Sequence, residues 1–231
     1  MTRLPEALRR LADRLDKPRA PDRRALARQI VGGLWEEMGA AQLAFLERRG
    51  LQPTDRMLDV GCGALRGGVH FIRYLDAGNY SGIDAQQWLL DAGTDELAKA
   101  GLTDRRPQLL CDATFDFARF GTTFDVALAQ SVFTHINLNL VHRCLVRVSE
   151  VLVPAGVFYA TILERPSPHH LDPVEFPQPD LPTTITYPDK NPYHYPVAFF
   201  AGLIDGLPLE LEYVGDWGSL RGQSMLAFHR V

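Results

Sequence analysis

Short apolar segments alternate with longer amphipathic segments through the middle of the chain. The short segments predict buried strands, and apolar positions three and four residues apart predict helices between them. The predicted strands lie at about 56–61, 79–83, 107–111, 124–130 and 156–163. Because strands and helices alternate, we expect a parallel sheet with right-handed crossovers between its strands.

Three helices are predicted between these strands. One runs up to Leu75, and a second spans about 86–100 and ends at Gly101. A third begins near Asn137, whose side chain is suited to capping a helix N-terminus. The apolar positions of this third helix step by three and four along one face. They are Leu138, Val141, Leu145, Val148 and Leu152.

The first 50 residues predict a helical extension. Leucines at helical spacing make residues 1–28 a basic amphipathic helix; they are Leu4, Leu8, Leu11 and Leu15. This stretch holds nine Arg/Lys and four Asp/Glu. It either docks on the domain by its leucines or touches an acidic substrate, a membrane surface or a partner. A second helix is predicted over about 23–49, ending at Gly50, with Gly32 and Gly33 as the point where it bends or splits.

The regular pattern breaks between Glu164 and Pro196. Nine of the sixteen prolines fall in this segment, and its aromatic content argues against disorder. A loop of this length inside a compact domain is usually functional, so we expect a Pro-rich lid over the substrate site at about 164–196. A short helix at about 195–205 and two strands at about 209–215 and 224–230 follow.

Composition limits the classes of function. At 231 residues and 46% apolar content, the chain suits one globular domain with an appendage. The sequence contains no apolar run of about eighteen residues, so no membrane span is predicted, and the N-terminus lacks a signal-peptide core. Three cysteines without a paired spacing, Cys62, Cys111 and Cys144, indicate a reducing, cytoplasmic setting. The net charge of −4 and the lack of an Arg/Lys stripe interleaved with aromatics argue against nucleic acid.

Chemistry-bearing residues stand at the ends of the first three predicted strands. Residues 58–63, Leu-Asp-Val-Gly-Cys-Gly, contain two glycines that permit a tight turn and a close approach of a ligand to the backbone. Asp84 ends the second strand and Asp112 the third. Since the carboxyl ends of parallel strands share one sheet edge, we expect Asp59, Asp84 and Asp112 to converge on one crevice.

These residues resemble the class I S-adenosylmethionine-dependent methyltransferases. The family's acidic-x-Gly-x-Gly loop is matched by Asp59, Gly61 and Gly63. The resemblance implies that Asp84 binds the ribose hydroxyls of the methyl donor and that Asp112 lies near its adenine. The implied cofactor-binding set is Asp59, Gly61, Cys62, Gly63, Asp84, Asp112, Ala113, Gln130 and Ser131. In this set the glycine loop faces the donor's amino acid portion, and the last two residues lie near its methyl group.

The resemblance covers about residues 51–231. Residues 124–132 look like the family's fourth strand and the loop that closes over the donor, and residues 152–156 look like its turn before strand five. The family often has a third glycine where Leu65 stands, and this chain has a Gly-Gly pair two residues later. The implied fold is a Rossmann-like α/β domain. Its seven-stranded sheet is mostly parallel, with an antiparallel C-terminal hairpin and helices on both faces.

Three residues around this site have two interpretations each. An acceptor hydroxyl or ammonium needs a general base, and His135, just beyond the fourth strand, is the candidate base or acceptor-orienting residue. Alternatively, His135 packs against or caps the helix that begins near Asn137. Asp112 could instead cap the turn at 113–118. Arg66 contacts the donor carboxylate or pairs with a neighbouring acid.

The Pro-rich segment holds two weaker candidate groups. One is an aromatic wall of the lid, which could equally be part of the core: Tyr187, Tyr193, His194 and Tyr195. The other group lacks any recognised metal-ligand spacing, and we expect no metal there: His169, His170, Asp172 and Glu175.

The sequence therefore favours an S-adenosylmethionine-dependent methyltransferase acting on oxygen or nitrogen of a small molecule, such as a sugar or another secondary metabolite. A nicotinamide-binding oxidoreductase is a first alternative, disfavoured because its Gly-x-Gly-x-x-Gly fingerprint requires a small residue where Arg66 stands. A catalytically inactive methyltransferase-like partner protein is a second. The acceptor, the methylated atom and the oligomeric state stay open, a homodimer included.

Overall fold

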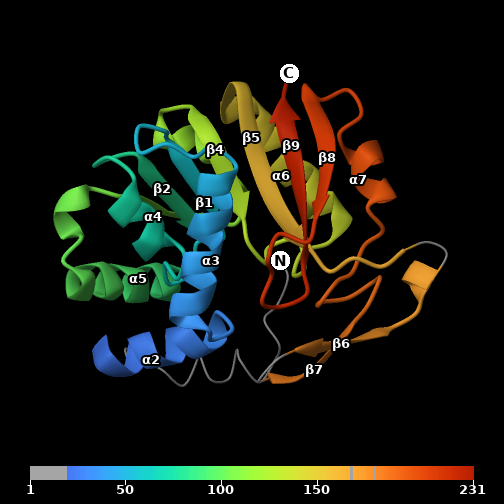
Figure 1. The fold of residues 1–231 in the computed structure, drawn as a ribbon, viewed down its shortest axis with the longest axis horizontal. Helices are drawn as coiled ribbons and strands as arrows, with labels where there is room; N and C mark the ends of the chain where they lie inside the picture. Colours follow the sequence, from blue (N-terminus) through green and yellow to red (C-terminus); the bar gives the residue numbers. More distant parts are fainter. Residues whose placement is uncertain (1–19, 167–168, 179–180) are drawn as a thin grey trace.

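A computed structural model of the chain describes residues 20–166, 169–178 and 181–231. This part forms three layers, with one sheet between two layers of helices (Figure 1). The basic helix predicted at the N-terminus falls mostly within residues 1–19, outside the described residues. Within the three described ranges, no helix combines the length and the apolar character needed to cross a bilayer.

The central sheet has seven strands in the order β3-β2-β1-β4-β5-β9-β8. The strands are β1 Met57–Val60, β2 Tyr80–Asp84, β3 Gln108–Cys111, β4 Phe124–Ala129, β5 Leu152–Ile162, β8 Leu209–Gly215 and β9 Ser224–Arg230. The first five pair in parallel, and β9 runs antiparallel between β5 and β8. The predicted Rossmann-like sheet with its antiparallel C-terminal hairpin is confirmed. The strand order reverses between β1 and β4, the point at which open α/β sheets bind ligands.

The helices cover both faces of this sheet (Figure 1). They are α2 Ala20–Ile30, α3 Trp35–Arg48, α4 Gly68–Tyr74, α5 Gln87–Ala100, α6 Leu138–Val151 and α7 Ala198–Leu203, with 3₁₀ turns η1 Thr103–Arg105, η2 Phe117–Phe120 and η3 His169–Leu171. The Asn137 side chain accepts a hydrogen bond from the Leu140 N–H and so caps α6, as predicted. Gly101 ends α5 in the left-handed conformation.

Successive side chains of the central strands point to opposite faces and supply two cores. The core that includes α6 and α7 holds Leu58, Val60, Ala127, Phe158, Leu226 and Phe228. The core that includes α3, α4 and α5 holds Met57, Leu128, Tyr159, Met225 and Ala227. Burial on both faces explains why these strands read as nearly continuous apolar runs in the sequence.

The helix predicted over residues 23–49 is divided into α2 and α3. Gly32, Gly33 and Leu34 all have positive φ angles, of 94°, 61° and 45°. Three successive residues in this conformation cannot continue a right-handed helix, so the chain turns sharply there. α3 then joins the second core, where Phe45 packs edge-on against Trp217 and Tyr159. The predicted domain boundary at residue 50 stays a prediction.

The Pro-rich segment contains a hairpin that the sequence did not predict. Strands β6 Val174–Gln178 and β7 Leu181–Thr186 pair antiparallel and form a separate two-stranded sheet beside the main one (Figure 1). The pairing shifts register between Phe176 and Gln178, where Pro177 cannot donate to the ladder. A short strand can thus contain a proline where the ladder is irregular. The high proline content of the segment predicts an irregular loop, and that prediction is wrong for β6 and β7.

Candidate functional site

The glycine loop after β1 is bound tightly to the end of β2. The N–H groups of Gly61 and Cys62 both donate to the Ile83 carbonyl, at 2.8 and 3.1 Å. Gly61 and Gly63 have φ angles of 70° and 54°, which favour glycine. A Cβ at Gly61 would lie 2.5 Å from Cγ2 of Val132. Glycine is therefore required there both by conformation and by the close approach of the loop after β4.

Cys62 contributes its backbone rather than its thiol to this loop. Its side chain is buried, and Sγ lies 2.9 Å from the place that a Cβ on Gly82 would occupy. Burial raises the pKa of the Cys62 thiol well above its ordinary value. The predicted role of Cys62 at the cofactor can therefore only be a backbone one.

Asp84 fastens the glycine loop to the end of β2. Its Oδ2 accepts a hydrogen bond from the Gly63 N–H at 3.0 Å, and its Oδ1 accepts one from the Gln86 N–H at 2.9 Å. Burial raises the pKa of this carboxyl, while the N–H donors lower it. A carboxylate has about four lone-pair positions, so Asp84 keeps capacity to accept further hydrogen bonds from a ligand at this edge.

Asp59 lies under the loop and faces the core. Its side chain is 6% exposed and accepts a hydrogen bond from the Tyr80 hydroxyl at 2.7 Å. Burial raises the pKa of Asp59 to about 7, a shift that the Tyr80 bond opposes and the nearby Asp84 reinforces. Of the three acids expected to converge on one crevice, Asp59 is therefore the one whose carboxylate is bonded to Tyr80 of β2 within the core.

The raised pKa of Asp59 predicts a stability that depends on pH. The charged form is disfavoured in the folded state, so the contribution of Asp59 is fully present below its unfolded pKa near 4 and is lost as pH rises through about 7. In Asp59→Asn we expect that loss to be absent, because an amide does not ionise over this pH range, and its oxygen can still accept the Tyr80 hydrogen bond. Urea unfolding measures this difference. Between pH 4.5 and 8, the free energy of unfolding of the variant should rise relative to that of the parent by up to about 4 kcal/mol, at about 1.4 kcal/mol per pKa unit.

The control for this experiment is Asp104→Asn, which changes an exposed carboxylate in η1. It should run parallel to the parent over the same pH range. A parallel curve for Asp59→Asn as well would show that Asp59 titrates alike in the folded and unfolded states, and burial would then not disfavour its charged form.

Asp112 forms a turn at the end of β3. Its Oδ1 accepts hydrogen bonds from the N–H groups of Thr114 at 2.6 Å and Asp116 at 3.3 Å, and Arg119 lies 3.5 Å from Oδ2. Asp112 therefore closes the first part of the turn predicted at 113–118, but the N-cap residue of η2 is Asp116, so Asp112 does not cap a helix. Its backbone N–H donates to the Asp84 carbonyl at 2.9 Å, which places Asp112 and Ala113 beside Asp84. Their contact with an adenine stays a prediction.

Gln130 and Ser131 meet Gln223 where β4 ends and β9 begins. Gln130 Nε2 donates to Ser131 Oγ at 3.1 Å and to Gln223 Oε1 at 3.0 Å, and Ser131 Oγ donates to Gln223 Oε1 at 3.0 Å. Ser131 has a positive φ of 60°, and its N–H donates to Thr161 Oγ1 at 2.7 Å. Strained backbone of this kind is concentrated at functional sites. The sequence offered no signal for Gln223, which stands 92 positions from Ser131.

His135 lies at the surface of the loop after β4. Its ring is exposed, and Nδ1 is 2.7 Å from Oδ1 of Asn191 in the Pro-rich segment. The cap of α6 is Asn137 instead, so the capping alternative for His135 is wrong. Among the described residues, Asn191 alone is hydrogen-bonded to this imidazole, and the catalytic role of His135 stays a prediction.

Three of the aromatic side chains proposed for a lid belong to the core. Tyr193 and Tyr195 are buried and stacked, with ring centroids 5.8 Å apart, and the Tyr195 hydroxyl donates to the Ile136 carbonyl at 2.8 Å. His194 is 1% exposed, and its Nδ1 lies 2.8 Å from Oγ1 of Thr186 in β7. The core interpretation is therefore confirmed for these three, and they anchor the hairpin to the domain.

The side chains weighed as metal ligands near His169 make separate contacts with their own neighbours. His169 Nδ1 lies 3.9 Å from Oδ2 of Asp172, while the ring of His170 packs edge-on against Phe199. In the part of the chain that the structure describes, no cluster of three or more His, Cys, Asp or Glu side chains is arranged to hold a metal ion.

Arg66 holds the turn between α2 and α3. Its Nη1 donates to the carbonyls of Val31 and Gly33 at 2.6 and 3.0 Å, and Arg221 Nη2 donates to the carbonyl of Gly32 at 2.6 Å. Burial and then the charge of Arg221 lower the pKa of Arg66 to about 10, so it stays protonated at neutral pH. The predicted pairing of Arg66 with an acid is not formed with any described residue.

A family model and solved structures match this arrangement. Residues 57–156 match the model described as a methyltransferase domain. This span begins at β1, contains the glycine loop, Asp84 and Asp112, and ends within β5.

Three solved structures illustrate the shared fold. Magnesium protoporphyrin IX methyltransferase from Synechocystis PCC 6803 with bound S-adenosylmethionine is 13% identical at a TM-score of 0.62, covering 100% of both chains. The CcbJ methyltransferase from Streptomyces caelestis is 14% identical at a TM-score of 0.62, covering 83% of this chain and 89% of its own. The glycopeptide N-methyltransferase MtfA with S-adenosylhomocysteine is 14% identical at a TM-score of 0.59, covering 85% and 90%.

Proposed function

We propose that the chain is a class I S-adenosylmethionine-dependent methyltransferase and that it transfers the methyl group to oxygen or nitrogen of a small-molecule acceptor; the match of residues 57–156 to a methyltransferase domain and the shared fold support this. The observation that carries this proposal is the glycine loop fastened to Asp84 at the switch point of the sheet. The similar structures support the acceptor class, since they include a porphyrin methyltransferase and a glycopeptide N-methyltransferase.

The residues present fit the proposed donor. Gly61 and Gly63 leave the backbone bare where a side chain would obstruct it, and Asp84 has lone pairs left for two neighbouring hydroxyls. Charge-assisted hydrogen bonds from ribose hydroxyls to Asp84 would fix the orientation of the nucleoside. Asp59 holds the strand end from the core side through Tyr80. S-adenosylmethionine, when bound, supplies a methyl group activated by the sulfonium charge.

The chain's own contribution is largely positioning. In-line methyl transfer needs the acceptor atom held close to the methyl carbon in a site that excludes water. Gln130, Ser131 and Gln223 offer fixed hydroxyl and amide groups at the end of β4, where we place the reacting centre. A hydroxyl or ammonium acceptor also has to lose a proton, and His135 in the following loop is the proposed base.

The role of His135 predicts a split between turnover and binding. In His135→Ala we expect turnover to fall about tenfold while donor affinity stays unchanged, because the exposed ring can be replaced in part by water. Steady-state kinetics and calorimetry on the same preparation measure the two quantities. His142→Ala is the matched control, an exposed histidine of α6 bonded to the Leu203 carbonyl. Equal turnover in His135→Ala and the parent would remove the proposed base.

The alternatives differ in what they bind or transfer. A nicotinamide-binding oxidoreductase is opposed by Arg66, whose bulk and contacts with the α2–α3 turn occupy the position where the fingerprint needs a small residue. An inactive binding protein would bind the donor and transfer nothing. The experiment that tests the proposal is a screen of sugars, phenols, amines and carboxylic acids with isotope-labelled S-adenosylmethionine. Label in an extracted product supports it, and donor binding without transfer to any acceptor class would favour the inactive protein.

The remaining expectations stay proposals. Nothing in the charge distribution suggests nucleic acid as a partner, and the cysteines Cys62, Cys111 and Cys144 are free thiols, in keeping with the cytoplasmic setting expected from the sequence. The oligomeric state stays open.

A further inference from the structure

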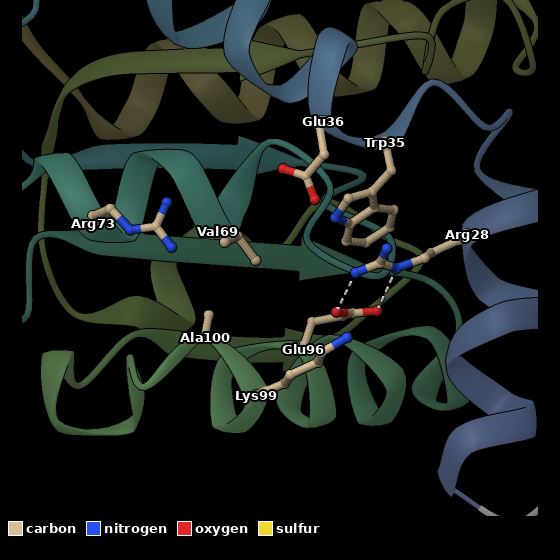
Figure 2. Close-up of a pocket in the computed structure, with 8 residues that line it drawn as sticks. All are labelled: Arg28, Trp35, Glu36, Val69, Arg73, Glu96, Lys99 and Ala100. Carbon is tan, nitrogen blue, oxygen red and sulfur yellow. Dashed lines mark hydrogen bonds and ion pairs between the residues drawn. The ribbon is translucent and has the colours of Figure 1, made fainter.

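α2 is attached to α5 by a buried carboxylate. Glu96 is 3% exposed, and it accepts hydrogen bonds from Arg28 Nε at 2.8 Å and Arg28 Nη2 at 2.7 Å. Arg24 Nη2 donates to the same carboxylate at 3.0 Å. Figure 2 shows the guanidinium of Arg28 reaching across from α2 to Glu96. Because two guanidiniums converge on it, the pKa of Glu96 is lowered despite its burial.

The attachment of α2 depends on charge more than on apolar packing. Among the side chains of α2 that the structure describes, Ala27 alone is fully buried. Arg23 donates to Asp95 of α5 as well, and Arg28 also stacks over the ring of Trp35 at 4.4 Å. A cavity of about 220 Å³ borders the Arg28–Glu96 pair (Figure 2). The Arg28 side chain is 34% exposed, so dissolved ions can approach this end of the pair and weaken it, although Glu96 itself is buried.

The C-terminal end of α2 leads directly onto the glycine loop. Val31 follows the helix, and its Cγ1 lies 3.1 Å from the place that a Cβ on Gly63 would occupy. Arg66 donates hydrogen bonds to the carbonyls of Val31 and Gly33, and Arg221 donates one to the carbonyl of Gly32 between them. The turn is thus held directly by the hydrogen bonds from Arg66 and Arg221 to its carbonyls. The helix that precedes it, α2, is held by its ion pairs with Glu96.

We propose that Glu96 is a positioning residue for the donor, acting through Arg28 and α2 to hold the Val31–Leu34 turn over the glycine loop. This inference rests on the donor site proposed above. Among the described residues, the hydrogen bonds of the Glu96 side chain are with Arg24 and Arg28 of α2, not with the glycine loop. The effect of Glu96 passes along α2, because the few apolar contacts of this helix and the Arg23–Asp95 pair do not fix it without the Glu96 carboxylate. When the ion pairs open, the turn loosens and a bound donor leaves faster.

The test is the release rate of S-adenosylhomocysteine from Glu96→Gln. Stopped-flow displacement should show release about tenfold faster than from the parent, because the amide leaves two guanidiniums without their counter-charge. Release from the parent should also accelerate with added NaCl, while the variant should respond much less. A role of Glu96 in stability alone would lower the melting temperature without changing this salt response.

Three further variants make the result decisive. Glu150→Gln breaks an exposed Arg147–Glu150 pair of α6 at 3.1 Å and should leave release unchanged. Arg28→Gln, which retains Glu96 and Arg24, serves if Glu96→Gln does not fold, and should accelerate release in the same direction. Glu96→Asp keeps the charge and should restore part of the slow release.

The outcomes separate the two proposals. If the parent fails to bind S-adenosylhomocysteine, the proposed function is wrong. If the parent binds it and both Glu96→Gln and Arg28→Gln release it at the parental rate with the parental salt response, Glu96 does not position the donor.

Discussion

Asp84→Ala should reduce the affinity for S-adenosylhomocysteine on the order of 1,000-fold. The carboxylate is expected to accept two hydrogen bonds from the ribose, and hydrogen bonds to a charged group contribute about 1.5–3 kcal/mol each. At about 1.4 kcal/mol per tenfold change, their loss accounts for this factor. The alanine variant also frees the N–H of Gly63, which Asp84 holds at 3.0 Å, so the loop loses its anchor together with the ligand contact. Calorimetric titration measures the affinity directly.

Two variants separate these contributions of Asp84. Asp84→Asn keeps the size of the side chain and one acceptor oxygen, so the loop stays partly anchored and the loss of affinity should be smaller than in the alanine variant. Asp104→Ala removes an exposed acid from η1, which precedes β3, and should bind like the parent. Parental affinity in Asp84→Ala, with circular dichroism showing a folded protein, would remove the ribose assignment.

Gly61→Ala should eliminate measurable donor binding and lower the free energy of unfolding. The left-handed conformation, with φ of 70°, costs a non-glycine residue about 1–2 kcal/mol. The added Cβ would also lie 2.5 Å from Cγ2 of Val132, and overpacking of this kind costs about 1–3 kcal/mol. The loop has to shift to relieve the clash, and the backbone that should approach the donor shifts with it. Urea unfolding and calorimetry give the two readouts.

The chain offers a matched control for each part of that effect. Gly121 has a similar φ of 66° with nothing within 4 Å of an added Cβ, so Gly121→Ala should show the conformational cost alone and full donor binding. In the double variant Gly61→Ala/Val132→Ala the clash is removed, since the added Cβ is 3.7 Å from the Cβ of Val132, and binding should recover in part. Equal stability and binding in Gly61→Ala and Gly121→Ala would show that the close contact with Val132 is unimportant.

The sheet could be predicted because its strands are buried on both faces and their ends carry chemistry. Apolar runs ending in Gly61, Asp84 or Asp112 gave both the position of each strand and the direction of its functional end. The cap at Asn137 and the end of α5 at Gly101 depend on local hydrogen bonds and backbone conformation, and both positions were predicted from single residues; the left-handed conformation of Gly101 is a finding of the structure. Local rules of this kind work where a residue's own neighbours in the sequence decide its conformation.

The hairpin β6–β7 could not be predicted in the same way. Its prolines predict irregular chain, although the alternation of Thr184, Ile185 and Thr186 is compatible with a strand. The burial of Tyr193, His194 and Tyr195 depends on contacts with residues far away in the sequence. A sequence pattern shows that aromatic residues are present but not which of them face the core.

The candidate site shows the same division between local and distant information. Gly61, Gly63 and Asp84 lie together at the ends of β1 and β2, joined by hydrogen bonds, and their contact with the donor stays a prediction. The side-chain direction of Asp59 was not given by the motif, and the structure turns it toward Tyr80. Gln223 and Glu96 carry no motif at all, because their importance comes from partners 92 and 68 positions away.

The central claim is that the edge formed by β1, β2 and β3 binds S-adenosylmethionine. The most direct measurement is a calorimetric titration of the purified chain with S-adenosylhomocysteine and, in parallel, with NADH. We expect saturable binding of one S-adenosylhomocysteine per chain and no heat from NADH. Binding of NADH without binding of S-adenosylhomocysteine would contradict this and would favour a nicotinamide-binding oxidoreductase instead.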